Sequence, residues 1–132
     1  MNDKAMTDSR QPPLDQRGLI AALRRFLPDE MILRAREDLR PYECDGLSAY
    51  RQQPMLTVLP RTIEQVQQIL RVCREGGVPV VARGAGTGLS GGALPLGNGL
   101  LLSLARFMSI LDIDPANRTM RVQPGVRNLA IS

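Results

Sequence analysis

The hydrophobic pattern of this chain is clearest between residues 55 and 75. Met55–Leu59 is a short apolar segment that predicts a strand. A helix is predicted to follow, from Thr62 to about Glu75, because Thr62 and Gln65 have the spacing of a capping box. Apolar residues at helical spacing predict the buried face of this helix, which consists of Val66, Ile69, Leu70 and Cys73.

A second predicted strand follows this helix. Gly76 and Gly77 allow the left-handed backbone that ends many helices, and Pro79 prevents the helix from resuming. The apolar segment 78–82 then predicts a strand. Two strands joined by a helix predict a right-handed parallel βαβ unit. Ligands of open parallel sheets bind beyond the carboxyl ends of the strands, and a glycine-rich segment follows at that end.

The pattern before residue 55 is less regular. Residues 1–13 are polar and end in Pro12-Pro13, which predicts a disordered lead. Asp15 is the expected cap of a first helix that Pro28 ends. Residues 29–54 predict a short helical turn and then irregular chain, so 14–54 is interpreted as an N-terminal helical segment. The apolar face of the first helix comprises Leu19, Ile20, Leu23, Phe26 and Leu27.

The pattern beyond residue 99 predicts a change of sheet type. Residues 100–104 predict a third strand, and residues 109–114 and 119–123 predict an antiparallel hairpin around the turn at 115–118. The last nine residues predict a turn and the start of a helix. The fold class is therefore α+β: a small parallel βαβ subdomain after an N-terminal helix, then the start of an antiparallel subdomain. We expect residues 55–132 to be the truncated N-terminal part of a larger domain.

Composition and charge narrow the function classes. The chain has 132 residues, of which 43% are hydrophobic, enough for the core of one domain. Its net charge is +4, but the basic residues are interleaved with acids, as in residues 34–40. This arrangement favours a solvated face of mixed charge over a nucleic-acid surface.

Cysteine and histidine usage argues against a metal centre in this segment. Cys44 and Cys73 are far apart in the sequence, and the chain has no histidine, so neither zinc nor iron–sulfur ligation is expected from these residues. The N-terminus lacks the apolar core of a secretory signal, and no segment is long enough to span a membrane. We expect a cytoplasmic protein with free thiols.

The most informative segment is residues 79–93, PVVARGAGTGLSGGA. Its glycines allow positive φ and close approach of the backbone to a ligand. Successive N–H groups in such a loop form an anion-binding nest. A flexible connector is the alternative, but apolar strands flank the loop on both sides, whereas polar sequence usually bounds a linker.

Two better-known phosphate motifs do not fit this loop. Residues 86–91 satisfy G-x-G-x-x-G, but the dinucleotide-binding fold needs a helix to begin there, and Pro95, Gly97 and Gly99 argue against one. A P-loop requires Lys and then Ser or Thr after its last glycine, and Gly92-Ala93 occupy those positions.

The order of these elements and the sequence of the loop resemble the FAD-binding domain of the vanillyl-alcohol oxidase and p-cresol methylhydroxylase (PCMH) type. Within that type, the chain is most similar to the FAD subunit of glycolate oxidase and its D-lactate dehydrogenase relatives. The resemblance covers about residues 40–132. It implies that backbone N–H groups of the loop bind the FAD diphosphate, with Ser90 and Gly91 completing its wall and Pro124-Gly125 approaching the cofactor. The residues so assigned to the diphosphate are Arg83, Gly84, Ala85, Gly86, Thr87, Gly88 and Leu89.

Alternatives remain for several of these residues. Arg83 either pairs with phosphate or braces the loop through a carboxylate, with the brace favoured. The hydroxyls of Thr87 and Ser90 either donate to phosphate or cap the loop locally. A plain turn also explains Pro124-Gly125. Many relatives attach the flavin through a histidine near the position of Thr87, and the chain contains none, so the resemblance implies non-covalent FAD.

The resemblance implies an FAD-dependent enzyme that oxidises a 2-hydroxy acid, such as glycolate or D-lactate, to the 2-oxo acid. The electrons would leave through partner subunits, including an iron–sulfur subunit, or through a quinone, with association at the inner face of the membrane through those partners. No catalytic residue is expected within this segment. The alternatives are another substrate on the same fold and a non-catalytic nucleotide-binding module.

Overall fold

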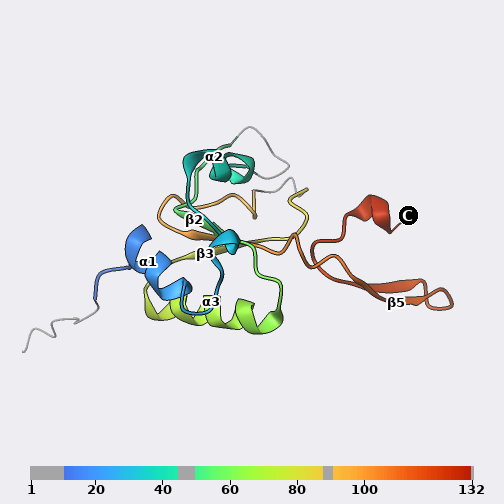
Figure 1. Ribbon diagram of the computed structural model, residues 1–132. Helices are drawn as coiled ribbons and strands as arrows, with labels where there is room; N and C mark the ends of the chain where they lie inside the picture. Colours follow the sequence, from blue (N-terminus) through green and yellow to red (C-terminus); the bar gives the residue numbers. More distant parts are fainter. Residues whose placement is uncertain (1–10, 45–49, 88–90, 132) are drawn as a thin grey trace, which may run out of the picture.

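The computed structural model describes residues 11–44, 50–87 and 91–131. Within them, a four-stranded sheet has the order β1-β2-β4-β3, and a separate two-stranded sheet pairs β5 with β6 (Figure 1). β4 pairs in parallel with β2 on one side and with β3 on the other, while β1 pairs antiparallel with β2. The four strands are β1 (Ile32–Leu33), β2 (Leu56–Val58), β3 (Val80–Arg83) and β4 (Leu100–Ser103).

The predicted parallel unit is present, with one strand inserted. Helix α3 (Ile63–Glu75) connects β2 to β3, but these two strands do not pair, because β4 lies between them. Leu100, Leu101 and Leu102 are buried on both faces of the sheet, which is the pattern of a central strand. The predicted third strand is therefore the centre of the sheet.

The main core lies between the sheet and the two longer helices, and α2 (Arg36–Leu39) lies on the other face of the sheet (Figure 1). Helix α1 (Gln16–Leu23) begins as predicted, because the Asp15 carboxylate accepts the Gly18 N–H at 2.8 Å. It ends four residues before Leu27, which still packs into the core from the turn that follows. The core side chains of these layers include Leu19, Leu23, Leu56, Val58, Ile69, Cys73, Leu100 and Leu102.

Helix α3 has the predicted caps and one error on its predicted buried face. The Gln65 N–H donates to Thr62 Oγ1 at 3.2 Å and the Gln65 side chain accepts from the Thr62 N–H, which completes the capping box. Gly77 has a φ of +65° at the C-terminal end. Leu70 was expected to be buried and is 44% exposed. Because α1 covers the side of α3 that carries Val72 and Gly76, Leu70 is turned away from that contact.

The segment between α1 and β2 contains a strand that the sequence pattern did not indicate. Short 3₁₀ turns, η1 (Asp29–Met31) and η2 (Arg40–Tyr42), flank β1 and α2. β1 has only two residues, too few to show an alternating pattern, and its pairing with β2 defines it. The expected division of the chain at residues 13 and 54 stays a prediction.

The predicted hairpin consists of β5 (Ile110–Asp114) and β6 (Thr119–Val122), and it projects away from the four-stranded sheet (Figure 1). Arg118 takes a φ of 55° in the turn. A register shift between Ile110 and Asp112 makes Leu111 a bulge. A short 3₁₀ turn, η3 (Asn128–Ala130), follows. None of the helices in the described parts of the chain is long and apolar enough to cross a membrane.

Candidate functional site

Three segments meet at the carboxyl edge of the parallel strands. The glycine loop leaves the end of β3, and residues 104–107 leave the end of β4, beside which the Leu104 N–H donates to the Arg83 carbonyl at 2.8 Å. After the hairpin the chain returns, and the Gly125 N–H donates to the Phe107 carbonyl at 2.8 Å. The two parts of the sequence that were assigned to one site, the loop and Pro124-Gly125, are therefore brought together.

The contact between these segments is made by backbone, and glycine is required on both sides. A Cβ on Gly84 would overlap the carbonyl oxygen of Pro124. A Cβ on Gly125 would lie 2.6 Å from the Leu104 carbonyl oxygen and 2.8 Å from that of Phe107. Neither glycine has a positive φ in this structure, so close packing, and not backbone strain, explains these two positions.

Positive φ occurs elsewhere in the loop. Gly86 has a φ of +73° and Gly91 a φ of +75°, both in the region where side chains are strained. A Cβ at Gly91 or Gly92 would meet no described atom within 4 Å, so this part of the loop has an open side. Residues 91–99, on the far side of the loop, form turns and no helix, in agreement with the exclusion of the dinucleotide-binding motif.

Arg83 is buried beneath the loop, with 7% of its surface exposed. Its guanidinium Nη2 donates to the Ala93 carbonyl at 2.9 Å and to the Tyr42 carbonyl at 3.3 Å, and its Cζ lies 5.8 Å from the centre of the Tyr42 ring. These bonds connect the start of the glycine loop to its end. Of the two hypotheses for Arg83, the geometry favours the brace. The acceptors of these two hydrogen bonds are backbone carbonyl oxygens, whereas a carboxylate was expected.

The other assigned residues differ in how the structure places them. Ala85 is half-buried next to Gly84, and Thr87 is exposed. Gly88, Leu89 and Ser90 lie outside the described residues, so their assignments stay predictions. No acidic residue occurs between Arg83 and Ala93, which leaves a loop of N–H donors, hydroxyls and one cation. This donor set fits a diphosphate.

Three residues near the site were not predicted from the sequence. Tyr42 contacts Arg83 from a segment that showed no periodicity. Thr57 and Ser103 are buried on the sheet face that also carries Arg83, and neither hydroxyl oxygen has a hydrogen-bond partner among the described residues. Ser103 pairs directly with Arg83 across β3 and β4. A hydroxyl residue within the apolar run 100–104 was the only sequence signal for it.

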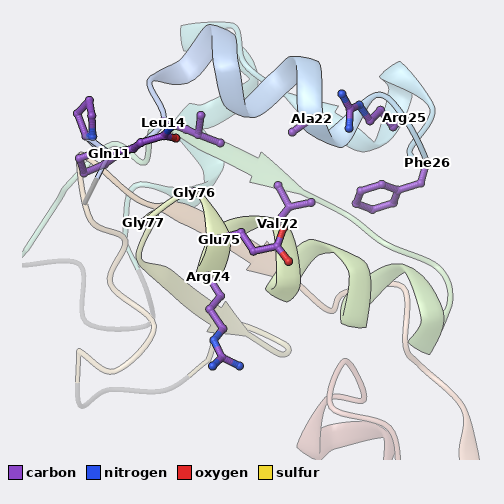
Figure 2. A pocket seen from close by; sticks show the side chains of 12 residues that line it. Gln11, Leu14, Ala22, Arg25, Phe26, Val72, Arg74, Glu75, Gly76 and Gly77 are labelled. Carbon is purple, nitrogen blue, oxygen red and sulfur yellow. The ribbon is translucent and has the colours of Figure 1, made fainter. Parts of the chain in front are cut away.

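A groove lies away from this edge. It has a volume of about 680 Å³ and lies between α1 and the C-terminal half of α3, where Phe26 and Val72 face one another (Figure 2). Its lining includes Gly76 and Gly77, which precede β3, whereas the glycine loop follows β3. None of the assigned site residues that the structure describes lines it. The groove is therefore separate from the candidate site.

Cys73, one of the two cysteines, belongs to the core beside this groove. It is 1% exposed, and burial raises the pKa of its thiol to about 11. A thiol with such a pKa stays protonated at neutral pH and is a poor nucleophile. This confirms the interpretation of Cys73 as a core residue.

Comparison with known proteins shows the family of the chain. The family model of an FAD binding domain matches residues 54–132. The chain is 60% identical over 125 residues to the glycolate oxidase subunit GlcD of Escherichia coli, covering 95% of this chain and 25% of that protein. It is 41% identical over 88 residues to GlcD of Bacillus subtilis, covering 67% of this chain and 19% of the relative. The chain thus spans about a quarter, or less, of the length of these relatives.

A solved structure supports the fold. The crystal structure of p-cresol methylhydroxylase with substrate bound superimposes with a TM-score of 0.74 at 27% identity, covering 86% of this chain and 23% of that one. The expected fold class, the resemblance to the PCMH type and the expectation of FAD as the cofactor of the family are confirmed. The family model matches more than half of the residues of this chain. The chain therefore belongs to the family of FAD-binding domains.

Proposed function

We propose that this chain forms the part of an FAD site that binds the diphosphate. The observation that carries the proposal is the closure of the glycine loop on Pro124 at the carboxyl edge of β3 and β4. That closure needs glycine at position 84, and Gly86, two residues further on, takes a positive φ. Ligands of parallel sheets bind at this edge.

The residues divide into donors and supports. The N–H groups of Gly84, Ala85, Gly86 and Thr87 are the described donors, and Gly88, Leu89, Ser90 and Gly91 complete the loop. Arg83 acts as a support, because its guanidinium already holds Ala93 and Tyr42 in place. Pro124 and Gly125 form the wall opposite the loop. As far as this segment is concerned, FAD is held without a covalent bond to histidine, since these residues contain none.

We further propose that the whole protein oxidises a 2-hydroxy acid. The proposal rests on the 60% identity to a glycolate oxidase subunit. The flavin, when bound, supplies the redox chemistry, and this chain contributes the position of the cofactor. The name of that relative as a subunit supports the proposal that the protein has partner subunits. From the family resemblance alone, we propose that one of these partners is an iron–sulfur protein that accepts the electrons and that the assembly lies at the inner face of the membrane.

A fusion protein tests the cofactor proposal. This chain replaces the matching part of E. coli GlcD, with which it is 60% identical, and the FAD content of the purified fusion is measured from its visible absorbance. We expect about one FAD per fusion protein, released by denaturation. Gly86→Val should lower the affinity for FAD at least tenfold, because the branched side chain is incompatible with the positive φ.

Gly92→Ala is the matched control, since its Cβ would meet no described atom within 4 Å. A folded fusion without FAD, beside an E. coli parent that retains it, would contradict the proposal. So would equal FAD affinity in the Gly86→Val and Gly92→Ala variants.

A further inference from the structure

Helix α1 forms a ridge between two hollows. On one side lies the groove of about 680 Å³ that α1 shares with α3, where Phe26 and Val72 face one another (Figure 2). On the other side lies a hollow of about 300 Å³, lined by residues of α1 together with Arg24 and Arg34. None of the described residues assigned to the candidate site lines either hollow. We call α1 and these two hollows the α1 ridge.

The α1 ridge carries more arginine than acid. Among the described lining residues of the two hollows, Glu75 on α3 is the one acid. The Asp15 carboxylate is used to cap α1, and Asp29 pairs with Arg24 at 2.7 Å. The other three arginines beside α1 are exposed and form no ion pair within the described parts of the chain. They are Arg17, Arg25 and Arg34.

The groove beside α1 has an apolar floor. Half-buried side chains line it, namely Leu14, Ala22, Phe26 and Val72. Leu14 is fixed at the C-terminal end of α3, because its N–H donates to the Gly76 carbonyl at 2.8 Å. A Cβ on Gly76 would lie 2.5 Å from Leu14 Cδ1, so the two residues are closely packed. A formed hollow with apolar walls can take the large apolar anchor residue of a protein partner.

The match to the relatives indicates that α1 is separate from the FAD domain itself. The family model begins at residue 54, whereas α1 ends at Leu23. The match to E. coli GlcD covers 95% of the chain and therefore includes α1. The α1 ridge is thus built by residues outside the family model, and this chain shares those residues with a relative that is named as a subunit.

The charge and shape of the α1 ridge together select the class of partner. Exposed arginines around an apolar hollow are complementary to an acidic polypeptide segment, since opposite charges orient the partner and the apolar centre supplies affinity. Arginine is also enriched at protein interfaces. A lipid surface or a nucleic-acid backbone would contact the arginines but would leave the concave groove unfilled. The combination therefore favours a protein.

We propose that the α1 ridge is the docking surface for an acidic segment of a partner subunit. The segment inserts an apolar side chain between Phe26 and Val72, and its carboxylates pair with Arg17 and Arg25. The proposal rests on the partner subunits proposed above and is independent of the proposed cofactor site. Because the groove lies away from the carboxyl edge of β3 and β4, the partner docks without covering the described part of the glycine loop.

Charge reversal tests the docking surface. The fusion of this chain with the remainder of E. coli GlcD is tagged and co-expressed with the other subunits of E. coli glycolate oxidase, and the partner that purifies with it is quantified. Arg17→Glu/Arg25→Glu should lower that amount at least tenfold, because like charges then face the acidic segment. The matched control is Arg36→Glu/Arg40→Glu, which changes the net charge equally at exposed positions of α2 and η2 and should change the yield less than twofold.

A photoreactive crosslinker attached to Ala22→Cys identifies what fills the groove. Ala22 lines the groove from α1, and Ala116→Cys in the turn of the hairpin is the matched control. Both are made in a Cys44→Ser background, and crosslinks are mapped by mass spectrometry. We expect position 22 to be joined to an acidic segment of a partner subunit, and position 116 not to be joined to that segment. A crosslink from position 22 to the remainder of GlcD, or to a second copy of the fusion, would overturn the proposal.

The other outcomes separate this proposal from the earlier ones. Equal partner yield in the two double variants would overturn the docking surface and leave the partner subunits in place. Absence of a partner from the wild-type fusion, with Cys73 protected from a thiol reagent, would contradict both. Binding to vesicles of anionic phospholipid that Arg17→Glu/Arg25→Glu abolishes, with partner yield unchanged, would also overturn the proposal. FAD content is measured separately, so a complex without FAD contradicts only the cofactor site.

Protection of the buried Cys73 thiol reports whether each protein is folded. If the charge-reversed variant loses this protection, Arg17→Gln/Arg25→Gln replaces it and should lower the partner yield at least threefold. If the fusion itself loses it, the same variants are made in the full-length protein that carries this chain and are judged by the same criteria.

Discussion

Gly84 packs against the carbonyl oxygen of Pro124, although 39 residues separate them in the sequence. The contact joins the loop at the end of β3 to the chain that returns from the hairpin. It leaves no space for a Cβ, so the position depends on glycine for packing. This relationship, together with the brace from Arg83, determines how the loop is held at the edge of the sheet.

Gly84→Ala should therefore destabilise the chain and weaken FAD binding. The added Cβ would force the loop and residue 124 apart, at a cost of about 1–3 kcal/mol in the free energy of unfolding. Urea unfolding of the chain and FAD titration of the fusion measure the two effects. Gly92→Ala is the control, because its Cβ would meet no described atom within 4 Å. Equal stability of the two variants would mean that the Gly84 contact is looser than the structure shows.

Arg83→Met should destabilise the loop by about 1.5–3 kcal/mol, since it removes charge-assisted hydrogen bonds to the carbonyls of two half-buried residues. Arg83→Lys should restore little, because a single ammonium group cannot reproduce the guanidinium geometry. Tyr42→Leu removes only the ring contact and should cost about 0.5–1 kcal/mol. Urea midpoints order the three variants. If the Lys variant is as stable as the wild type, charge alone accounts for the role of Arg83.

Thr62→Ala should lower stability by about 0.5–2 kcal/mol, because it removes the acceptor for the Gln65 N–H at the start of α3. The matched control is Thr119→Ala, an exposed threonine that caps no helix. Thermal unfolding followed by circular dichroism gives both values. A Thr62 variant that melts with the control would show that water replaces the cap at no cost.

Stability should fall with rising pH in the alkaline range because of Cys73. Burial raises the pKa of this thiol from 9.0 to about 11, so the unfolded chain releases the proton first. Between these two values the folded state binds more protons, and stability decreases by at most about 1.4 kcal/mol per pH unit. Below pH 9 the effect is absent.

Urea midpoints at pH 8 and pH 10.5 measure the effect of Cys73. The Cys73→Ala variant is less stable throughout, because it leaves a cavity, but it should lose this part of the pH dependence. An identical slope in wild type and variant would assign the alkaline loss to other groups.

Local signals account for what was predicted correctly. The capping box at Thr62 and the left-handed Gly77 depend on neighbours in sequence, and both are found in the structure. The apolar flanks of the glycine loop correctly predicted strands. Asp15 likewise caps α1 as expected.

Tertiary contacts account for what was missed. Leu70 is exposed because of where α1 packs on α3, and the spacing of apolar residues within α3 does not predict that position. β1 is a strand because it forms an antiparallel pair with the edge of β2. Tyr42 lies 41 residues from Arg83, and only the folded chain brings its ring to the guanidinium. For the loop itself, the sequence predicted the strands on both sides of it but not how Arg83 holds it.

The central position of β4 has a consequence for the order of folding. Until residues 100–103 are present, β3 has no strand to join and β2 has only the two-residue β1, so α3 is formed well before the sheet that it covers. The capping box supports that helix by local contacts alone. During synthesis, the apolar side of α3 and the strands beside it stay exposed until β4 has emerged from the ribosome. We therefore expect the sheet to assemble in one late step, with the nascent chain most open to aggregation or chaperone binding just before it.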